Sequence, residues 1–321
     1  MKLQKKYEIG QKVATREAYG DALAEFGSDP RIVVMDADLS KSTKTANFKK
    51  VYPERFINCG IAEGNMISVA AGLAASGKIA FASSFAMFAA GRAFEQVRNS
   101  VAYPHLNVKI GATHAGITVG EDGATHQCNE DISIMRTIPG MVVINPGDAV
   151  EARAAVYAAI HYDGPVYLRF GRLAVPVVND EETFEFEIGK GQQLREGTDV
   201  TIVSTGICTA EALKAADALK AEGVSAAVVN IHTIKPIDRE ILIAAAKKTG
   251  CIVTAEEHNV IGGLGSAVCE VLAEECPVPV LRVGVQDTFG KSGKAAELID
   301  EFGISAPFIA KKAKEAILLK K

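Results

Sequence analysis

Two histidines and two acidic residues share one glycine-rich stretch of the sequence. The stretch runs from Gly111 to Gln127 and contains His114, Glu121, Asp122 and His126. It follows an apolar run typical of a β-strand, and loops at the carboxyl ends of parallel strands line ligand crevices. Because imidazole and carboxylate groups both donate or accept protons near neutral pH, the stretch predicts a site for proton transfer or sugar binding.

An alternative interpretation of the same stretch is a zinc-binding site. His114, Asp122, His126 and Cys128 are all residue types that bind zinc. Their spacing matches no compact zinc-binding pattern, so the proton-transfer interpretation is favoured.

Two further segments carry candidate functional groups. Glu63 directly follows a predicted strand and falls in the first turn of a predicted helix. The helix dipole favours an acid there, so the position alone does not separate a structural carboxylate from a catalytic one. Phe85 and Phe88 could belong to the core or form a stacking surface for a ligand.

Three familiar motifs are incomplete. The turn at Gly263 lacks the third glycine of a dinucleotide fingerprint, and close packing of a helix on a sheet is the favoured explanation. Residues 290–294 lack the glycine spacing of a phosphate-binding loop. The stretch from Asp36 lacks the glycine and the bidentate glutamate of a calcium loop.

Elements that would position these groups alternate along the chain. Apolar runs separated by helical patterns predict an α/β fold, with mostly parallel sheets covered by helices on both sides. In the first half, the predicted strands are 31–35, 55–58, 79–84, 108–113, 141–145 and 166–170, and the predicted helices are 15–26, 63–76, 88–103 and 148–162.

A second αβ series follows a polar, acidic linker at 175–197, which could contribute an edge strand. Its predicted strands are 199–204, 226–231, 251–255 and 278–285, and its predicted helices are 209–222, 238–249, 264–275, 294–302 and 307–319. We therefore expect two domains, at 1–184 and 185–321.

Composition narrows the class of protein. The chain has 321 residues and a formal net charge of −4, from 35 Lys and Arg against 39 Asp and Glu, which argues against a strongly basic nucleic-acid-binding surface. No apolar run reaches the ~18 residues that a membrane span requires, and the N-terminus lacks the apolar segment of a signal peptide. The six cysteines form no Cys-x-x-Cys pair, so we expect a cytoplasmic protein with reduced thiols.

Three motifs occur in the order and spacing found in the C-terminal half of transketolases. They are residues 60–66 around Glu63, residues 84–88 and the stretch from His114 to His126. Over essentially its whole length the chain resembles the separate C-terminal subunit of a split transketolase. The resemblance implies a pyrimidine-binding domain followed by a transketolase C-terminal domain. Deoxyxylulose-phosphate synthases belong to the same superfamily, but they usually lack a histidine at the position of His114.

The resemblance implies thiamine diphosphate as cofactor and transfer of a two-carbon ketol unit between sugar phosphates. Glu63 would hydrogen-bond the pyrimidine ring nitrogen of the cofactor and promote its activation, a role suited to a carboxyl in an apolar pocket. Phe88 would stack on the pyrimidine, with Phe85 beside it. Asp38 would also lie near the cofactor.

The resemblance also nominates residues for the sugar phosphate. Four of them would bind the phosphate group: Arg16, Ser42, His114 and Arg172. Arg169 competes with Arg172 for this role, since either guanidinium could bind phosphate in a bidentate manner. Asp122 and His126 would contact the hydroxyls of the donor sugar, and His126 would assist proton transfer.

One expected motif is absent from the sequence. Members of this family bind Mg²⁺ and the diphosphate through Gly-Asp-Gly followed by paired asparagines, and this chain contains neither. We therefore expect an N-terminal partner subunit that carries this motif, in an α₂β₂ assembly. Two alternatives stay open. One is another thiamine-diphosphate enzyme half, synthase-like or specific for an unusual sugar, and the other is a non-catalytic scaffold chain.

Overall fold

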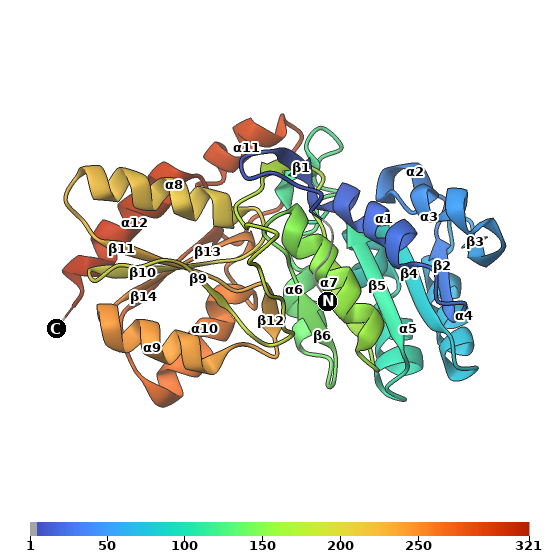
Figure 1. The fold of residues 1–321 in the computed structure, drawn as a ribbon. Coiled ribbons are helices and arrows are strands. Elements are labelled where there is room, and N and C mark those ends of the chain that lie inside the picture. Colours follow the sequence, from blue (N-terminus) through green and yellow to red (C-terminus); the bar gives the residue numbers. More distant parts are fainter. Residues whose placement is uncertain (1–4, 321) are drawn as a thin grey trace.

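The computed structural model describes residues 5–320, and two β-sheets form its framework (Figure 1). The first sheet has seven strands in the order β12-β6-β7-β5-β4-β2-β3. Six of them are parallel: β2 (Ile32–Asp36), β3 (Phe56–Asn58), β4 (Ile79–Phe85), β5 (Val108–Thr113), β6 (Val142–Ile144) and β7 (Val166–Arg169). The seventh, β12 (Thr233–Lys235), comes from the second half of the chain and pairs antiparallel with β6.

Helices cover both faces of this sheet. Along β4, Ile79 and Phe81 pack with α1 (Thr15–Phe26) and α7 (Ala149–His161), whereas Ala80 and Ala82 pack with α4 (Glu63–Ala75). Since successive side chains of a strand point to opposite faces, α1 and α7 lie on one face and α4 on the other. The α/β architecture predicted from the alternating pattern is confirmed.

The predicted helix at 88–103 is wrong in its geometry. The segment consists of π-helical turns at Met87–Arg92 and Val97–Ala102 around a short α5 (Phe94–Gln96). The amide of Ala93 donates to the Phe88 carbonyl, five residues back, at 3.2 Å. The run is rich in small residues, so apolar periodicity could not distinguish a π turn from an α turn. π turns are frequent at functional sites.

A short antiparallel pair was not predicted from the sequence. β1 (Lys12–Ala14) pairs with β8 (Ala174–Pro176), immediately before α1 and soon after β7. The Thr15 hydroxyl also accepts from the Gly171 amide at 2.8 Å. This pairing brings two distant segments of the chain together at the carboxyl end of the first sheet. Three short helices were also missed: α2 (Ser40–Thr43), α3 (Ala46–Val51) and α6 (Asp131–Arg136).

The second sheet has five strands in the order β14-β13-β10-β11-β9. Its strands are β9 (Gln192–Arg195), β10 (Val200–Ser204), β11 (Ala226–Asn230), β13 (Ile252–Asn259) and β14 (Val280–Val285). β9 lies in the predicted linker and forms an antiparallel edge strand, as the sequence suggested. α8 (Cys208–Ala221) and α12 (Ala306–Leu318) cover one face of the sheet, and α9 (Arg239–Thr249) and α10 (Leu264–Glu275) cover the other, while α11 (Ala295–Glu301) lies nearer the first sheet (Figure 1).

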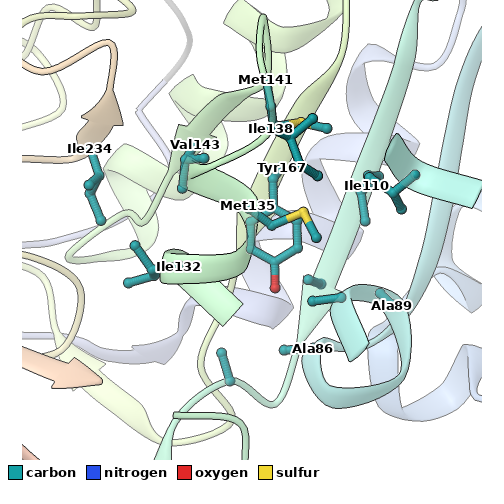
Figure 2. Packing of buried hydrophobic residues seen from close by; sticks show 14 of the residues in the cluster. Ala86, Ala89, Ile110, Ile132, Met135, Ile138, Met141, Val143, Tyr167 and Ile234 are labelled. Carbon is teal, nitrogen blue, oxygen red and sulfur yellow. The ribbon is translucent and has the colours of Figure 1, made fainter. Parts of the chain in front are cut away.

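The two halves of the chain share one apolar core. Ile132 and Met135 of α6 lie in the same buried cluster as Ile110 of β5 and Ile234 of β12 (Figure 2). The cluster continues into α9 and α10 of the second half. Because this core is continuous, the second half of the chain packs directly against the first half around α6 and β5.

The glycine turn before α10 has a packing role, as favoured from the sequence. A Cβ atom on Gly263 would lie 2.0 Å from Glu256 Oε2. The same carboxylate accepts from the amides of Leu264 and Gly265 at 2.7 and 2.8 Å, so it caps the helix where a dinucleotide would place its phosphates. Among residues 5–320, no helix is long and apolar enough to cross a membrane.

Candidate active site

Candidate residues from four elements meet at the carboxyl ends of the parallel strands. Phe85 ends β4 and faces Thr113 of β5 in the register of the sheet, so the next residue, His114, packs against its ring. The His114 and Phe85 ring centroids lie 3.8 Å apart. Glu63 opens α4, and Arg172 lies between β7 and β8. The sheet therefore collects groups that lie far apart in sequence, such as Glu63 and Arg172, which are 109 residues apart.

Glu63 is a buried carboxylate with a cationic partner. Its side chain is 1% exposed, and Arg92 Nη1 donates to Oε2 at 2.8 Å. For the other oxygen, Oε1, the described part of the chain offers a single long contact, 3.5 Å to the Ser84 hydroxyl. Burial of a charge is costly unless the charge is paired, which explains the approach of Arg92. Oε1 keeps the capacity to accept a stronger hydrogen bond.

An aromatic surface lies beside this carboxylate. The Phe85 and Phe88 rings are nearly parallel, with centroids 5.9 Å apart and an angle of 17°. The guanidinium of Arg92 lies over the Phe88 ring at 4.6 Å. Phe88 is half-buried and, together with Met87 and Arg92, lines a cleft of about 720 Å³. An aromatic face beside a buried carboxylate suits a flat heteroaromatic ligand.

His114 is held between the aromatic surface and a guanidinium. Arg16 Nη1 lies 2.9 Å from His114 Nε2 and also donates to the Ser42 carbonyl at 2.9 Å. His114 Nδ1 lies 2.9 Å from the Thr113 hydroxyl. An arginine can only donate, so Nε2 is the acceptor and the ring proton sits on Nδ1. His114 is thus a neutral imidazole.

Positive charge accumulates around His114. Burial, and then the charges of Arg16, Arg172, His126 and Lys44, lower the pKa of His114 to about 3. Burial and Arg172 also lower the pKa of Arg16, against the opposing effect of Glu17. Within residues 5–320, the buried Arg16 Nε has no hydrogen-bond acceptor. The cations of this group outnumber its carboxylates, Glu17 and Glu121, and both of these side chains are exposed, so the group is suited to an anion.

Arg172 and Arg169 occupy different environments. Arg169 is buried, and it forms an ion pair with Asp131, with Nε at 2.8 Å from Oδ2. Arg172 is 38% exposed and contacts the Val119 carbonyl and, at 3.4 Å, the exposed Glu121 carboxylate. The guanidinium of Arg169 is therefore committed to the protein interior, whereas Arg172 can turn toward a ligand.

His126 approaches the aromatic surface from the histidine loop, as we name residues 114–127. Its ring meets Phe88 edge-on at 5.5 Å between centroids. Nδ1 lies 2.9 Å from the Thr125 hydroxyl, which leaves Nε2 for a substrate oxygen. Asp122 is exposed, at the outer turn of the same loop.

Two nominated residues have looser connections to this cluster. Asp38 is exposed, with a φ of 65°, and its carboxylate accepts from the Asn58 amide group at 2.9 Å. Ser42 reaches Arg16 through its backbone carbonyl and not through its hydroxyl. As for zinc, among residues 5–320 no three His, Cys, Asp or Glu side chains converge into a group that could hold a metal ion.

Arg92 was missed by the sequence analysis. It follows Phe88 by four residues, a spacing that places both on one side of a helical turn and could have drawn attention to it. Its contact with Glu63 spans 29 residues and could not be read from the sequence. Glu257 of β13 was also missed, and it contacts the histidine loop across 139 residues.

Protein-family models match both halves of the chain. The pyrimidine-binding domain of transketolase matches residues 11–177, and the transketolase C-terminal domain matches residues 189–309.

Curated relatives match over nearly the full chain. A protein of Methanocaldococcus jannaschii described as a transketolase C-terminal section is 54% identical over 303 residues, which cover 94% of this chain and 95% of the relative. The SqwH subunit of a 6-deoxy-6-sulfo-D-fructose transketolase from Clostridium sp. is 50% identical, with 94% and 93% covered.

A solved structure has the same fold. It is described as a split-gene transketolase in the form of an inactive β4 tetramer. It is 56% identical to this chain, with a TM-score of 0.90, and the match covers 96% of this chain and 100% of the other.

Proposed function

This chain belongs to the transketolase family, and we propose that it supplies the C-terminal half of an enzyme that transfers a two-carbon ketol unit between sugar phosphates. One observation carries the proposal. Phe85 joins two groups of residues, because it stacks on His114 at 3.8 Å and lies parallel to Phe88. The carboxylate and aromatic surface suited to a cofactor ring therefore adjoin the cationic group suited to a phosphate.

The family depends on thiamine diphosphate, and the site fits that group. Glu63 would share a proton with the pyrimidine ring nitrogen through Oε1, and the Phe88 face would hold the ring by stacking. When bound, the cofactor supplies the electron sink for cleavage of a carbon–carbon bond next to a carbonyl. Arg92 would orient the Glu63 carboxyl group through its hydrogen bond to Oε2. Asp38, two residues after the end of β2, is a further proposed contact of the cofactor.

The protein would then orient the sugar and control its protons. Arg16, His114 and Arg172 would hold the phosphate, with Ser42 at the edge of the same group. Arg172 is preferred to Arg169 because Arg169 is consumed by its buried pair with Asp131. His126 Nε2 would donate or accept a proton at the hydroxyl and carbonyl oxygens of the donor sugar, and Asp122 would contact its hydroxyls.

A partner subunit completes this proposal. Relatives that match this chain end to end are described as a C-terminal section and as a subunit, which implies an N-terminal partner. We propose that this partner contributes the Gly-Asp-Gly motif, Mg²⁺ and the diphosphate site, in an α₂β₂ assembly. The inactive β4 assembly of the 56% identical chain agrees with a C-terminal half that lacks activity alone. We place the domain boundary near residue 185, between the two matched family domains.

The cationic group could bind the anionic end of more than one kind of donor sugar. Ordinary pentose phosphates suit the cationic group, but one relative is named for a sulfonated hexose, whose anionic group has similar geometry. The test is a ketol-transfer assay on the complex with its N-terminal partner, with xylulose 5-phosphate, 6-deoxy-6-sulfofructose or pyruvate as the donor. Transfer from either sugar supports the proposal and identifies the donor. Activity with pyruvate alone would identify a synthase instead, and no activity with any donor would favour a scaffold chain.

A further inference from the structure

We infer that Glu257, from the second half of the chain, positions the histidine loop and thereby sets the affinity of the site for its sugar. The inference rests on the proposed function, because it takes His114 and His126 as the sugar-binding ends of that loop. It assigns a positioning task to the C-terminal domain, whose residues Asn259, Asp287 and Phe289 also line the cleft beside Phe88.

The contact itself is short and buried. The Thr118 amide donates to Glu257 Oε1 at 2.6 Å, and the Glu257 side chain is 3% exposed. Burial raises the pKa of Glu257 to about 7. Both the neutral and the charged carboxyl offer an oxygen to the Thr118 amide, so the bond does not depend on ionisation.

The loop is shaped to receive this carboxyl group. Gly116 has a φ of 74°, and a Cβ atom there would lie 2.2 Å from Glu257 Cδ. Only glycine permits both this backbone conformation and this approach. The Gly116 amide also donates to the Cys128 carbonyl at 2.9 Å, which closes the base of the loop.

A second tie joins the loop to the same half of the chain. Gln127 Nε2 donates to the Lys291 carbonyl at 2.9 Å and to the Ile117 carbonyl at 3.0 Å. The Glu257 carbonyl is itself held by Arg169 at 3.0 Å, and Arg169 is anchored by Asp131. The loop thus rests on a rigid, buried network, with His114 four residues before the Thr118 contact and His126 eight residues after it.

The strand offers a matched control. Glu256 is the neighbour of Glu257 on β13 and is equally buried, but its carboxylate caps α10 and does not touch the loop. A change at Glu256 therefore perturbs a buried carboxyl in the same strand without releasing the loop.

The test uses Glu257→Ala, Glu257→Gln and Glu256→Gln in the complex with the N-terminal partner. We expect Glu257→Ala to raise the KM for the sugar by about tenfold, equivalent to about 1.4 kcal/mol, with thiamine-diphosphate affinity unchanged. Glu257→Gln should restore most of the affinity, because its amide oxygen still accepts from Thr118. Glu256→Gln should shift the melting temperature but not the KM. An unchanged KM in Glu257→Ala, or an equal rise in Glu256→Gln, would overturn the inference.

Hydrogen exchange separates this inference from the proposed function. In the full chain without substrate, amides of residues 114–127 should exchange faster in Glu257→Ala than in the wild type, and at the wild-type rate in Glu256→Gln. This readout needs no activity, so an inactive complex would count against the ketol-transfer proposal alone. Equal exchange of the loop in all variants would contradict the positioning role. Should Glu257→Ala fail to fold, Glu257→Met takes its place in both experiments, because it fills a similar volume but offers no carboxyl oxygen to the Thr118 amide.

Discussion

Arg16 Nη1 lies 2.9 Å from His114 Nε2, so a guanidinium and an imidazole face each other without a carboxylate between them. Since the guanidinium can only donate, the imidazole must be neutral, with its proton on Nδ1 beside the Thr113 hydroxyl. The arrangement keeps positive charge and unused donors at the carboxyl end of the sheet. A bound phosphate would accept hydrogen bonds from the Arg16 guanidinium. In this structure, one nitrogen of that guanidinium, Nη1, donates to His114.

This arrangement makes stability depend on pH. Burial and neighbouring cations hold the pKa of His114 at about 3, whereas a histidine in an unfolded chain titrates near 6.5. Below pH 6.5 the unfolded chain binds a proton that the folded chain does not, so the free energy of unfolding falls as the pH falls. Between pH 7.5 and 5.5 the wild type should lose about 1 kcal/mol more than His114→Asn in urea unfolding. His161→Asn, at an exposed position of α7, is the control variant. An equal loss of unfolding free energy in the wild type and in His114→Asn would refute the prediction.

Glu63→Gln should abolish most of the activity and leave assembly intact. The amide cannot replace a carboxylate in proton control, so kcat in the complex should fall by a factor of about 10²–10⁴. Size-exclusion chromatography checks the assembly. Glu240→Gln alters an exposed acid in the first turn of α9 and should leave kcat unchanged. Near-normal turnover of Glu63→Gln would mean that Glu63 has no catalytic role and only stabilises the first turn of α4.

The ion pair between Glu63 and Arg92 should be measurable as a coupling energy. Glu63 is buried but Arg92 is 52% exposed, so solvent screening limits the pair to about 1 kcal/mol. A double-mutant cycle with Glu63→Gln and Arg92→Met, followed by urea unfolding, gives this value. A coupling energy of zero would mean that the two side chains do not support each other in solution.

Substitutions of the two candidate arginines, Arg172 and Arg169, should affect different properties: the first the KM and the second the stability. Arg172→Met should raise the KM for a phosphorylated donor by about 10- to 100-fold, the cost of a charged hydrogen bond, with little change in melting temperature. A donor without phosphate should be insensitive to this change. Arg169→Met should instead destabilise the fold by about 3–5 kcal/mol, because it leaves Asp131 buried without its cation. The reverse pattern would assign the phosphate to Arg169.

Much of the fold could be predicted from the sequence because the strands are short, apolar and separated by periodic helices. β5 and α10 have the predicted bounds, and Asp148 caps α7 by accepting from the Glu151 amide at 2.9 Å. The missed elements β1, β8, α2, α3 and α6 have only three to six residues each, too few for a period to show. β12 was missed for another reason: it leaves its own half of the chain to join the first sheet.

Only those residues of the site that lie in recognisable motifs could be predicted from the sequence. His114, His126 and Glu63 stand in runs whose residue types suggest chemistry, and the sheet brings Phe85 beside His114 as parallel strands require. Arg16 and Arg172 are brought together by the β1–β8 pair, whose two strands lie about 160 residues apart in the sequence. No local sequence pattern predicts this pairing. Long-range contacts such as Thr118 to Glu257 depend on packing and stay invisible until the structure is known.

The central claim is that this chain carries one half of a ketol-transferring site, and its direct test is the assay of the chain alone and with its N-terminal partner. Xylulose 5-phosphate, ribose 5-phosphate, Mg²⁺ and thiamine diphosphate are supplied, and glyceraldehyde 3-phosphate is detected. We expect product from the complex and none from the chain alone. Turnover by the isolated chain at the rate of the complex would contradict the claim that the active site is shared between two subunits.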